Sequence, residues 1–105
     1  MPKQSTRRPT HPGAILREDI LPELGISVAE LAGRMQISGR VLSDVIHERR
    51  AVTPDIALRL GRVFNNTPQF WLRLQESVDV WDTWQSRRSD YSRIKPLEPR
   101  LRRPA

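Results

Sequence analysis

Apolar residues recur at helical spacing in five segments of this 105-residue chain, and no segment alternates polar and apolar residues as a strand would. The clearest pattern spans residues 27–50, where two short amphipathic stretches are separated by only a few residues. Ser27 and Ser38 precede these stretches and suit helix N-caps. So short a joint predicts a helix-turn-helix, whose second helix presents a polar face. The apolar positions of the two stretches are Val28, Leu31, Ala32, Met35, Leu42, Val45 and Ile46.

Three further helices are predicted around this motif. The first begins at Pro12, because proline suits the first helical turn. It should end near residue 20 or 21, because Pro22 lacks an N–H and disfavours helix in the residue before it. A fourth and a fifth helix begin after Thr53 and Thr67, each a capping residue followed by proline. The predicted fold class is therefore all-α, a five-helix bundle that contains a helix-turn-helix.

The net charge of +6 is unevenly distributed along the chain. Residues 1–11 carry three basic residues and no acidic one, residues 87–105 carry seven basic and two acidic, and the middle holds eight basic and ten acidic. Both ends are rich in proline and poor in large apolar residues, which is typical of mobile segments. Basic mobile arms suit a polyanion such as nucleic acid, although ends that only aid solubility explain the charge equally well.

The charge distribution and the helical pattern together divide the chain into three predicted parts. Residues 1–11 form a flexible basic N-terminal arm, residues 12–86 form the helix-turn-helix domain with a C-terminal dimerisation helix, and residues 87–105 form a basic C-terminal tail. With no cysteine and two histidines, neither a disulfide framework nor a zinc site is expected. We expect a cytoplasmic protein without a membrane segment, metal or cofactor. An enzyme is not expected, because the chain lacks a cysteine nucleophile and a glycine-rich phosphate loop.

Four stretches between His11 and about Trp84, a range that covers roughly three-quarters of the chain, point to one protein family. They read HPGAILRED, VAELAGRM followed by ISGRVLSDVI, TPDIALRL, and TPQFWLRLQ. In these stretches the chain resembles the HigA/VapI group of antitoxins, a branch of the Xre/Cro-type helix-turn-helix proteins with a lambda-repressor-like DNA-binding domain. The resemblance implies a small homodimer that represses its own promoter by binding a palindromic operator. It also implies a partner, an mRNA-cleaving toxin of the HigB/RelE type, which the protein neutralises.

The chain departs from the family pattern in two places. Gln36 stands in the turn of the motif, where the family usually has glycine, and a left-handed conformation there would cost about 1 kcal/mol relative to glycine. After the second helix of the motif the family often reads Asn-Gly-Arg-Arg, whereas this chain reads His47-Glu48-Arg49-Arg50. The two arginines are therefore better candidates for phosphate contacts than His47.

The first turns of the second helix of the motif would reach base edges in the major groove of DNA. Arg40 is the one long donor there and suits guanine O6 and N7, whereas Asp44 would accept from cytosine N4 or orient Arg40. The alternative is an ordinary surface ion pair between these two side chains. The family resemblance favours the groove role for Arg40 and leaves both alternatives open for Asp44. The predicted base-reading residues are Gly39, Arg40, Val41 and Asp44. The predicted phosphate-binding residues are Ser27, Ser38, Ser43, His47, Arg49 and Arg50, of which Ser27 and Ser38 are also fully explained by capping.

The last predicted helix carries more large apolar residues than one helix of a small bundle needs. Core packing best explains Phe70, Trp71 and Leu74, which come first along it. The predicted dimer interface consists of Val78, Trp81 and Trp84, because a two-fold dimer must bury a patch against itself. The surface that binds the toxin is not indicated. The alternative function is a toxin-binding module whose helix-turn-helix no longer reads DNA.

Overall fold

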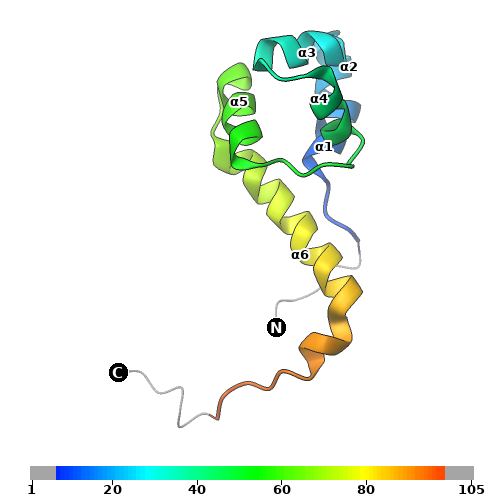
Figure 1. The fold of residues 1–105 in the computed structure, drawn as a ribbon, viewed down its shortest axis with the longest axis vertical. Coiled ribbons are helices and arrows are strands. Elements are labelled where there is room, and N and C mark those ends of the chain that lie inside the picture. The colour runs from blue at the N-terminus through cyan, green and yellow to red at the C-terminus, as the bar shows by residue number, and fades with distance from the viewer. Residues whose placement is uncertain (1–6, 99–105) are drawn as a thin grey trace, which may run out of the picture.

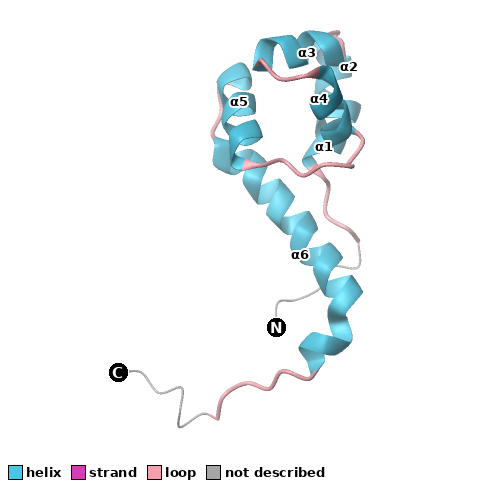
Figure 2. Cartoon of the chain, in the orientation of Figure 1, coloured by secondary structure: helices cyan, strands magenta, loops and turns pink. Residues whose placement is uncertain are grey.

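The computed structural model describes residues 7–98, and within this range every regular element is a helix (Figure 2). The first three elements follow one another without a break, so they form one continuous helix and the total is five. In chain order the elements are α1 (Pro12–Ile15), the π-helical η1 (Leu16–Ile20), α2 (Leu21–Leu24), α3 (Val28–Met35), α4 (Gly39–Ile46), α5 (Pro54–Phe64) and α6 (Pro68–Ser92). The prediction of an all-α, five-helix fold is confirmed.

The helices before α6 gather into a bundle, and α6 begins beside α5 and then extends away from the bundle (Figure 1). The centre of the bundle is filled by apolar side chains from every helix, as the amphipathic patterns predict. The largest fully buried side chains are Pro12, Leu16, Leu31, Leu42, Val45, Ile46, Leu60, Trp71 and Val78. No described helix combines the length and the apolarity that a membrane crossing needs.

The helix starts lie at the predicted caps. The Oγ of Ser27 accepts a hydrogen bond from the backbone N–H of Glu30 at 3.0 Å, and the Oγ of Ser38 accepts one from Val41 at 3.1 Å. Thr53 and Thr67 cap α5 and α6 in the same way. Each cap satisfies an N–H that the first helical turn leaves without a partner, so these residues define where each helix begins.

The first helix continues past Pro22 to Leu24, so the prediction that it ends at residue 20 or 21 is wrong. The reason is the π turn η1, in which the N–H of Leu21 bonds to the carbonyl of Leu16 five residues earlier. Pro22 directly follows this π turn, as the second residue of α2. Gly25 ends the helix in a left-handed conformation, with φ of 66°.

The opening His11-Pro12-Gly13 serves the contact between α1 and α4. The Nδ1 of His11 accepts a hydrogen bond from the N–H of Gly13 at 2.8 Å and thereby caps α1. Gly13 is buried, and a Cβ at this position would collide with the carbonyl of Val45 in α4. Only glycine therefore allows α1 to lie this close to the second helix of the motif.

Gln36 ends α3 in a left-handed conformation, with φ of 58° and ψ of 45°. This confirms the expectation for the position where the family usually has glycine. From α5, Nη1 of Arg59 donates hydrogen bonds to the carbonyls of Met35 and Gln36 at 3.0 and 3.2 Å. The turn of the motif is thus held by a neighbouring helix despite its strained residue.

Gln36→Gly is expected to raise the free energy of unfolding by about 1 kcal/mol, because glycine adopts the left-handed region without steric cost. For a domain of this size, the melting temperature should rise by about 5 °C. Ala29→Gly is the matched control, because it places glycine at a helical position of the first turn of α3 and should lower stability, by up to about 1 kcal/mol. An unchanged or lower melting temperature for Gln36→Gly would contradict the prediction.

Both ends of the domain differ from the expected boundaries. The tail predicted from residue 87 begins as helix, because α6 runs to Ser92 with a kink at Arg87, where φ is −128° and ψ is 24°. Across the kink, Tyr91 stacks on Trp84 with ring centroids 5.7 Å apart, which holds the last turns of the helix. In the arm, His11 is 4% exposed, and Arg8 pairs with Asp82 of α6. Residues 93–98 follow α6 without regular structure and are exposed. Residues 1–6 of the predicted arm and residues 99–105 of the predicted tail lie outside the described range.

The burial of the large side chains of α6 differs from the prediction. Trp71 is fully buried and Leu74 is half-buried, but Phe70 is 45% exposed and packs edge-on against Trp71. Val78 is 1% exposed within this one chain. Its assignment to a dimer interface is therefore wrong, because its surface is already covered by the chain's own residues.

Candidate nucleic-acid interface

The first turn of α4 presents an exposed face. Leu42, Val45 and Ile46 anchor the opposite side of the helix in the core, so Gly39 and Arg40 point outward and are exposed. Val41 is half-buried. Within residues 7–98, Arg40 makes no ion pair or side-chain hydrogen bond. Its five N–H donors are therefore available to a ligand that approaches this face.

Asp44 has partners other than the expected Arg40. Its Oδ1 lies 3.2 Å from Nη2 of Arg49, and its Oδ2 lies 3.9 Å from Nη2 of Arg50. The side chain is only 20% exposed. The predicted ion pair between Arg40 and Asp44 is therefore wrong, as is the suggestion that Asp44 orients Arg40. Asp44 instead holds the two arginines beside the end of α4.

The polar residues predicted to bind phosphate are placed around α4, except for Ser27 at the start of α3. Ser27 and Ser38 use Oγ as acceptors in their caps, so each hydroxyl hydrogen can still be donated to an anion. The Nδ1 of His47 lies 2.8 Å from the carbonyl of Ser43 and 3.4 Å from its Oγ, so this ring folds back against α4. Arg49 and Arg50 are exposed and extend the cationic surface past the helix end.

The loop after α4 contains a residue that the sequence reasoning did not single out. Glu48 is left-handed, with φ of 62°, at the position where the family often has glycine. Its carboxylate bonds to Arg8 from the N-terminal arm at 2.9 Å and approaches Arg17 of η1 at 3.4 Å. The glycine of the family pattern would have indicated the left-handed backbone here, but no local signal indicates partners 40 and 31 residues away.

His11 is the buried histidine of this region. Its Nδ1 accepts the hydrogen bond from Gly13, which requires the neutral ring with Nδ1 unprotonated. Burial lowers the pKa of His11, although the charge of Glu48 acts in the opposite direction. The N-cap of α1 is therefore intact while the imidazole is neutral.

The stability of the protein is expected to fall as the pH is lowered below about 6.5, the ordinary histidine pKa. As the pH falls, His11 is protonated in the unfolded chain before it is protonated in the folded chain, because folding lowers its pKa. The contribution of neutral His11 to stability is therefore complete above this pH. It is lost as the pH falls through the lower folded pKa. Urea unfolding at pH 7 and pH 5 measures this difference.

Asparagine also caps helices but does not titrate, so His11→Asn should flatten this pH dependence. His47→Asn removes the exposed histidine and serves as the control, which should retain the wild-type dependence. Equal slopes for His11→Asn and wild type would contradict the prediction.

Comparisons with known proteins agree with this geometry. No family model matches the chain. Antitoxin HigA-1 of Vibrio cholerae is 33% identical over 95 residues, which cover 90% of each chain. The uncharacterized HTH-type transcriptional regulator YbaQ of Escherichia coli is 37% identical over 103 residues, which cover 96% of this chain and 91% of the relative. The chain belongs to the HigA-type helix-turn-helix antitoxin family.

Solved structures place the HigA-type fold over most of the chain. The structure titled Pseudomonas aeruginosa antitoxin HigA with higBA promoter matches with a TM-score of 0.82 and 37% identity, over 87% of this chain and all of that one. Antitoxin GraA in complex with its operator matches with a TM-score of 0.82 and 34% identity, over 91% and 98%. The named HigA-type relatives are transcriptional regulators and antitoxins, which is a non-enzymatic family.

Proposed function

We propose that this chain is an antitoxin and transcriptional autorepressor, which binds a palindromic operator as a homodimer and neutralises a cognate mRNA-cleaving toxin of the HigB/RelE type. The observation that carries the proposal is Arg40 on the first turn of α4, which is exposed and has no partner within the described residues. The chain that carries it matches an antitoxin whose structure was solved with its promoter. A cytoplasmic location, where operator and toxin would both be met, is part of the proposal.

The proposed roles on DNA agree with the placement of each side chain. Arg40 reads guanine O6 and N7, and Val41 meets a thymine methyl where Gly39 allows close approach. Asp44 acts mainly by holding the arginines that follow α4, and direct base reading by Asp44 stays a prediction. The residues that bind phosphate are Ser27, Ser38, Ser43, Arg49 and Arg50, and His47 stays a weaker candidate.

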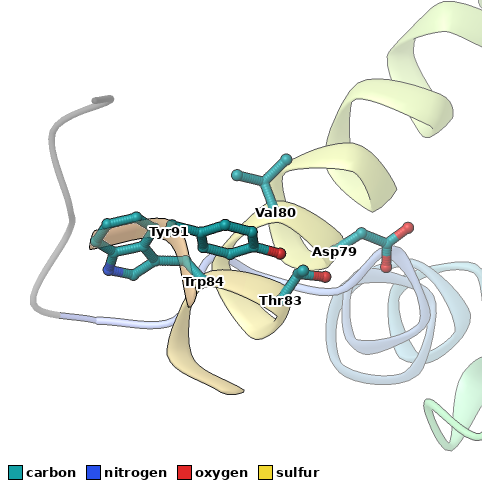
Figure 3. Close-up of a pocket in the computed structure, with 5 residues that line it drawn as sticks. All are labelled: Asp79, Val80, Thr83, Trp84 and Tyr91. Carbon is teal, nitrogen blue, oxygen red and sulfur yellow. The ribbon is translucent and has the colours of Figure 1, made fainter. Parts of the chain in front are cut away.

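The dimer contact is proposed on the far half of α6, where Trp81 and Trp84 are half-buried. Trp84 and its stacked partner Tyr91 line an apolar groove of about 300 Å³ (Figure 3). Val80 lies at this groove and is 51% exposed, and the Nε1 of Trp84 is buried without a hydrogen-bond partner in the described part of the chain. A second copy of α6 would cover this apolar patch, as a two-fold dimer requires.

Light scattering during gel filtration tests the dimer. Val80→Lys should yield a monomer, because a charge in the centre of a self-complementary apolar patch is left unpaired. Gln69→Lys adds the same charge to the exposed first turn of α6 and should remain a dimer. A monomeric wild type at micromolar concentration would refute the proposed interface.

Selection of random duplexes by the purified protein tests the repressor. We expect a palindrome with half-sites about one helical turn, roughly 34 Å, apart. The alternative function, a toxin-binding module that does not read DNA, predicts no enriched sequence and an affinity that falls steeply with salt. Neutralisation is tested separately, by co-expressing the chain with an mRNA-cleaving protein encoded beside it. Growth should resume only when the chain is present.

A further inference from the structure

One arginine of the N-terminal segment joins two distant parts of the fold. The Nε and Nη2 of Arg8 donate to the two carboxylate oxygens of Asp82 on α6, at 2.8 and 2.9 Å. The Nη1 of the same guanidinium donates to Glu48, in the loop after α4, at 2.9 Å. We infer that Arg8 is a positioning residue for operator binding, because it fastens the loop that carries Arg49 and Arg50 to α6. The inference rests on the operator binding proposed above.

The loop is held at several points, and Glu48 is the central one. Its second oxygen approaches Nη2 of Arg17 at 3.4 Å, and Nη1 of Arg17 donates to the carbonyl of Ile46, the last residue of α4, at 2.6 Å. At the other end of the loop, the buried Gln75 of α6 accepts the N–H of Val52 at 2.9 Å. The residues between these anchors are therefore fixed relative to both α4 and α6.

This network is stronger than a single surface ion pair. The Arg8–Asp82 contact is bidentate, and bidentate pairs joined into networks hold geometry better than isolated exposed charges. Hydrogen bonding by Arg8 lowers the pKa of Asp82. Burial acts to raise the pKa of Glu48, but hydrogen bonds from Arg8 and Arg17 bring it below its ordinary value. Both carboxylates are therefore charged at neutral pH.

The network also lies next to the arginines that it would position. Arg8, Glu48 and Asp82 line one shallow polar groove together with Arg49 and Arg50. The backbone of Glu48 is left-handed and directly precedes Arg49. A change in the Glu48 side-chain anchor would therefore release the backbone from which both arginines project.

The direction in which DNA affinity changes when an acidic residue is neutralised separates a positioning role from a purely electrostatic effect. Asp82 and Glu48 are acidic, so removing either charge should tighten DNA binding if charge alone mattered. A positioning role predicts the opposite, weaker binding on removal of a negative charge. Asp82→Asn is the sharpest variant, because Asp82 lies on α6 and not in the loop itself.

The experiment titrates the dimer with the operator that the wild type selects, at about 0.15 M salt. Asp82→Asn, Glu48→Gln and Arg8→Gln should each weaken binding about fivefold, the scale of coupling within one ion-pair network. The double variant Arg8→Gln, Asp82→Asn should bind no more weakly than Arg8→Gln alone. Asp90→Asn is the matched control, because it removes the partner of Arg93 farther along α6 and should not weaken binding.

A second measurement needs no DNA. Amide hydrogen exchange at residues 48–50 should be faster in Asp82→Asn than in the wild type, while the core amides stay protected. Operator binding by Asp82→Asn that is unchanged or tighter overturns the inference, and so does unchanged exchange in the loop. If the wild type itself selects no operator, the proposed function fails, and the exchange measurement still decides whether Arg8 holds the loop.

Discussion

Arg40→Ala is expected to weaken binding of the selected operator by about 1 to 3 kcal/mol in each half-site, the value of one bidentate contact to a base. The expectation follows from the exposed and unpaired state of Arg40 on the first turn of α4 within residues 7–98. Because its side chain stabilises no other described part of the fold, the folded protein should keep its melting temperature. Titration of the operator, and of duplexes changed at one base pair at a time, measures both affinity and preference.

Arg40→Lys is the control that separates charge from geometry. Lysine keeps the positive charge but lacks the planar fork of donors, so it should lose much of the base preference while keeping the salt dependence. If Arg40→Ala instead weakens all duplexes equally, Arg40 contacts phosphate and another residue reads the sequence. That result would leave the repressor in place but move the base-reading role elsewhere on α4.

Much of the helical framework could be predicted because its signals are local. The serine and threonine caps act on N–H groups within three residues, and the apolar stripes follow from helical spacing alone. The left-handed Gln36 was also predictable, because the turn between α3 and α4 requires such a residue and the family usually provides glycine.

The end of the first helix was not predictable from local rules. Pro22 normally disfavours the helix that precedes it, but the π turn at Leu16–Ile20 changes the register of the hydrogen bonds. The end of α6 was missed for a similar reason. Its last turns follow a kink and are held by the stacking of Tyr91 on Trp84, a contact between residues on the two sides of that kink.

The charge partners of the candidate site were the least predictable feature. The N–H of Arg49 bonds to the carbonyl of Asp44 at 2.7 Å, so the chain turns back and brings this arginine to the Asp44 carboxylate. Helical spacing alone favoured Arg40 as the partner. The contact between Arg8 and Asp82 joins residues 74 positions apart, and only the tertiary fold places them together.

Gly13→Ala is expected to destabilise the protein by about 1 to 3 kcal/mol, the usual cost of overpacking. The added Cβ would collide with the backbone carbonyl of Val45, which cannot move without shifting α4. The helix that begins at Pro12 would have to withdraw, and Leu16, which is fully buried, would lose part of its packing. Urea unfolding measures the loss. Operator affinity should fall as well, because α4, whose contact with α1 is disturbed, carries the base-reading residue Arg40.

Gly33→Ala is the matched control for this prediction. Gly33 lies inside α3 with no heavy atom within 4 Å of the added Cβ, so alanine there should stabilise the helix by up to about 1 kcal/mol. The same substitution at two helical glycines is thus expected to have opposite signs, because one faces α4 and the other faces open space. If both variants unfold at the same or a higher urea concentration than wild type, the close approach of α1 to α4 does not limit this position.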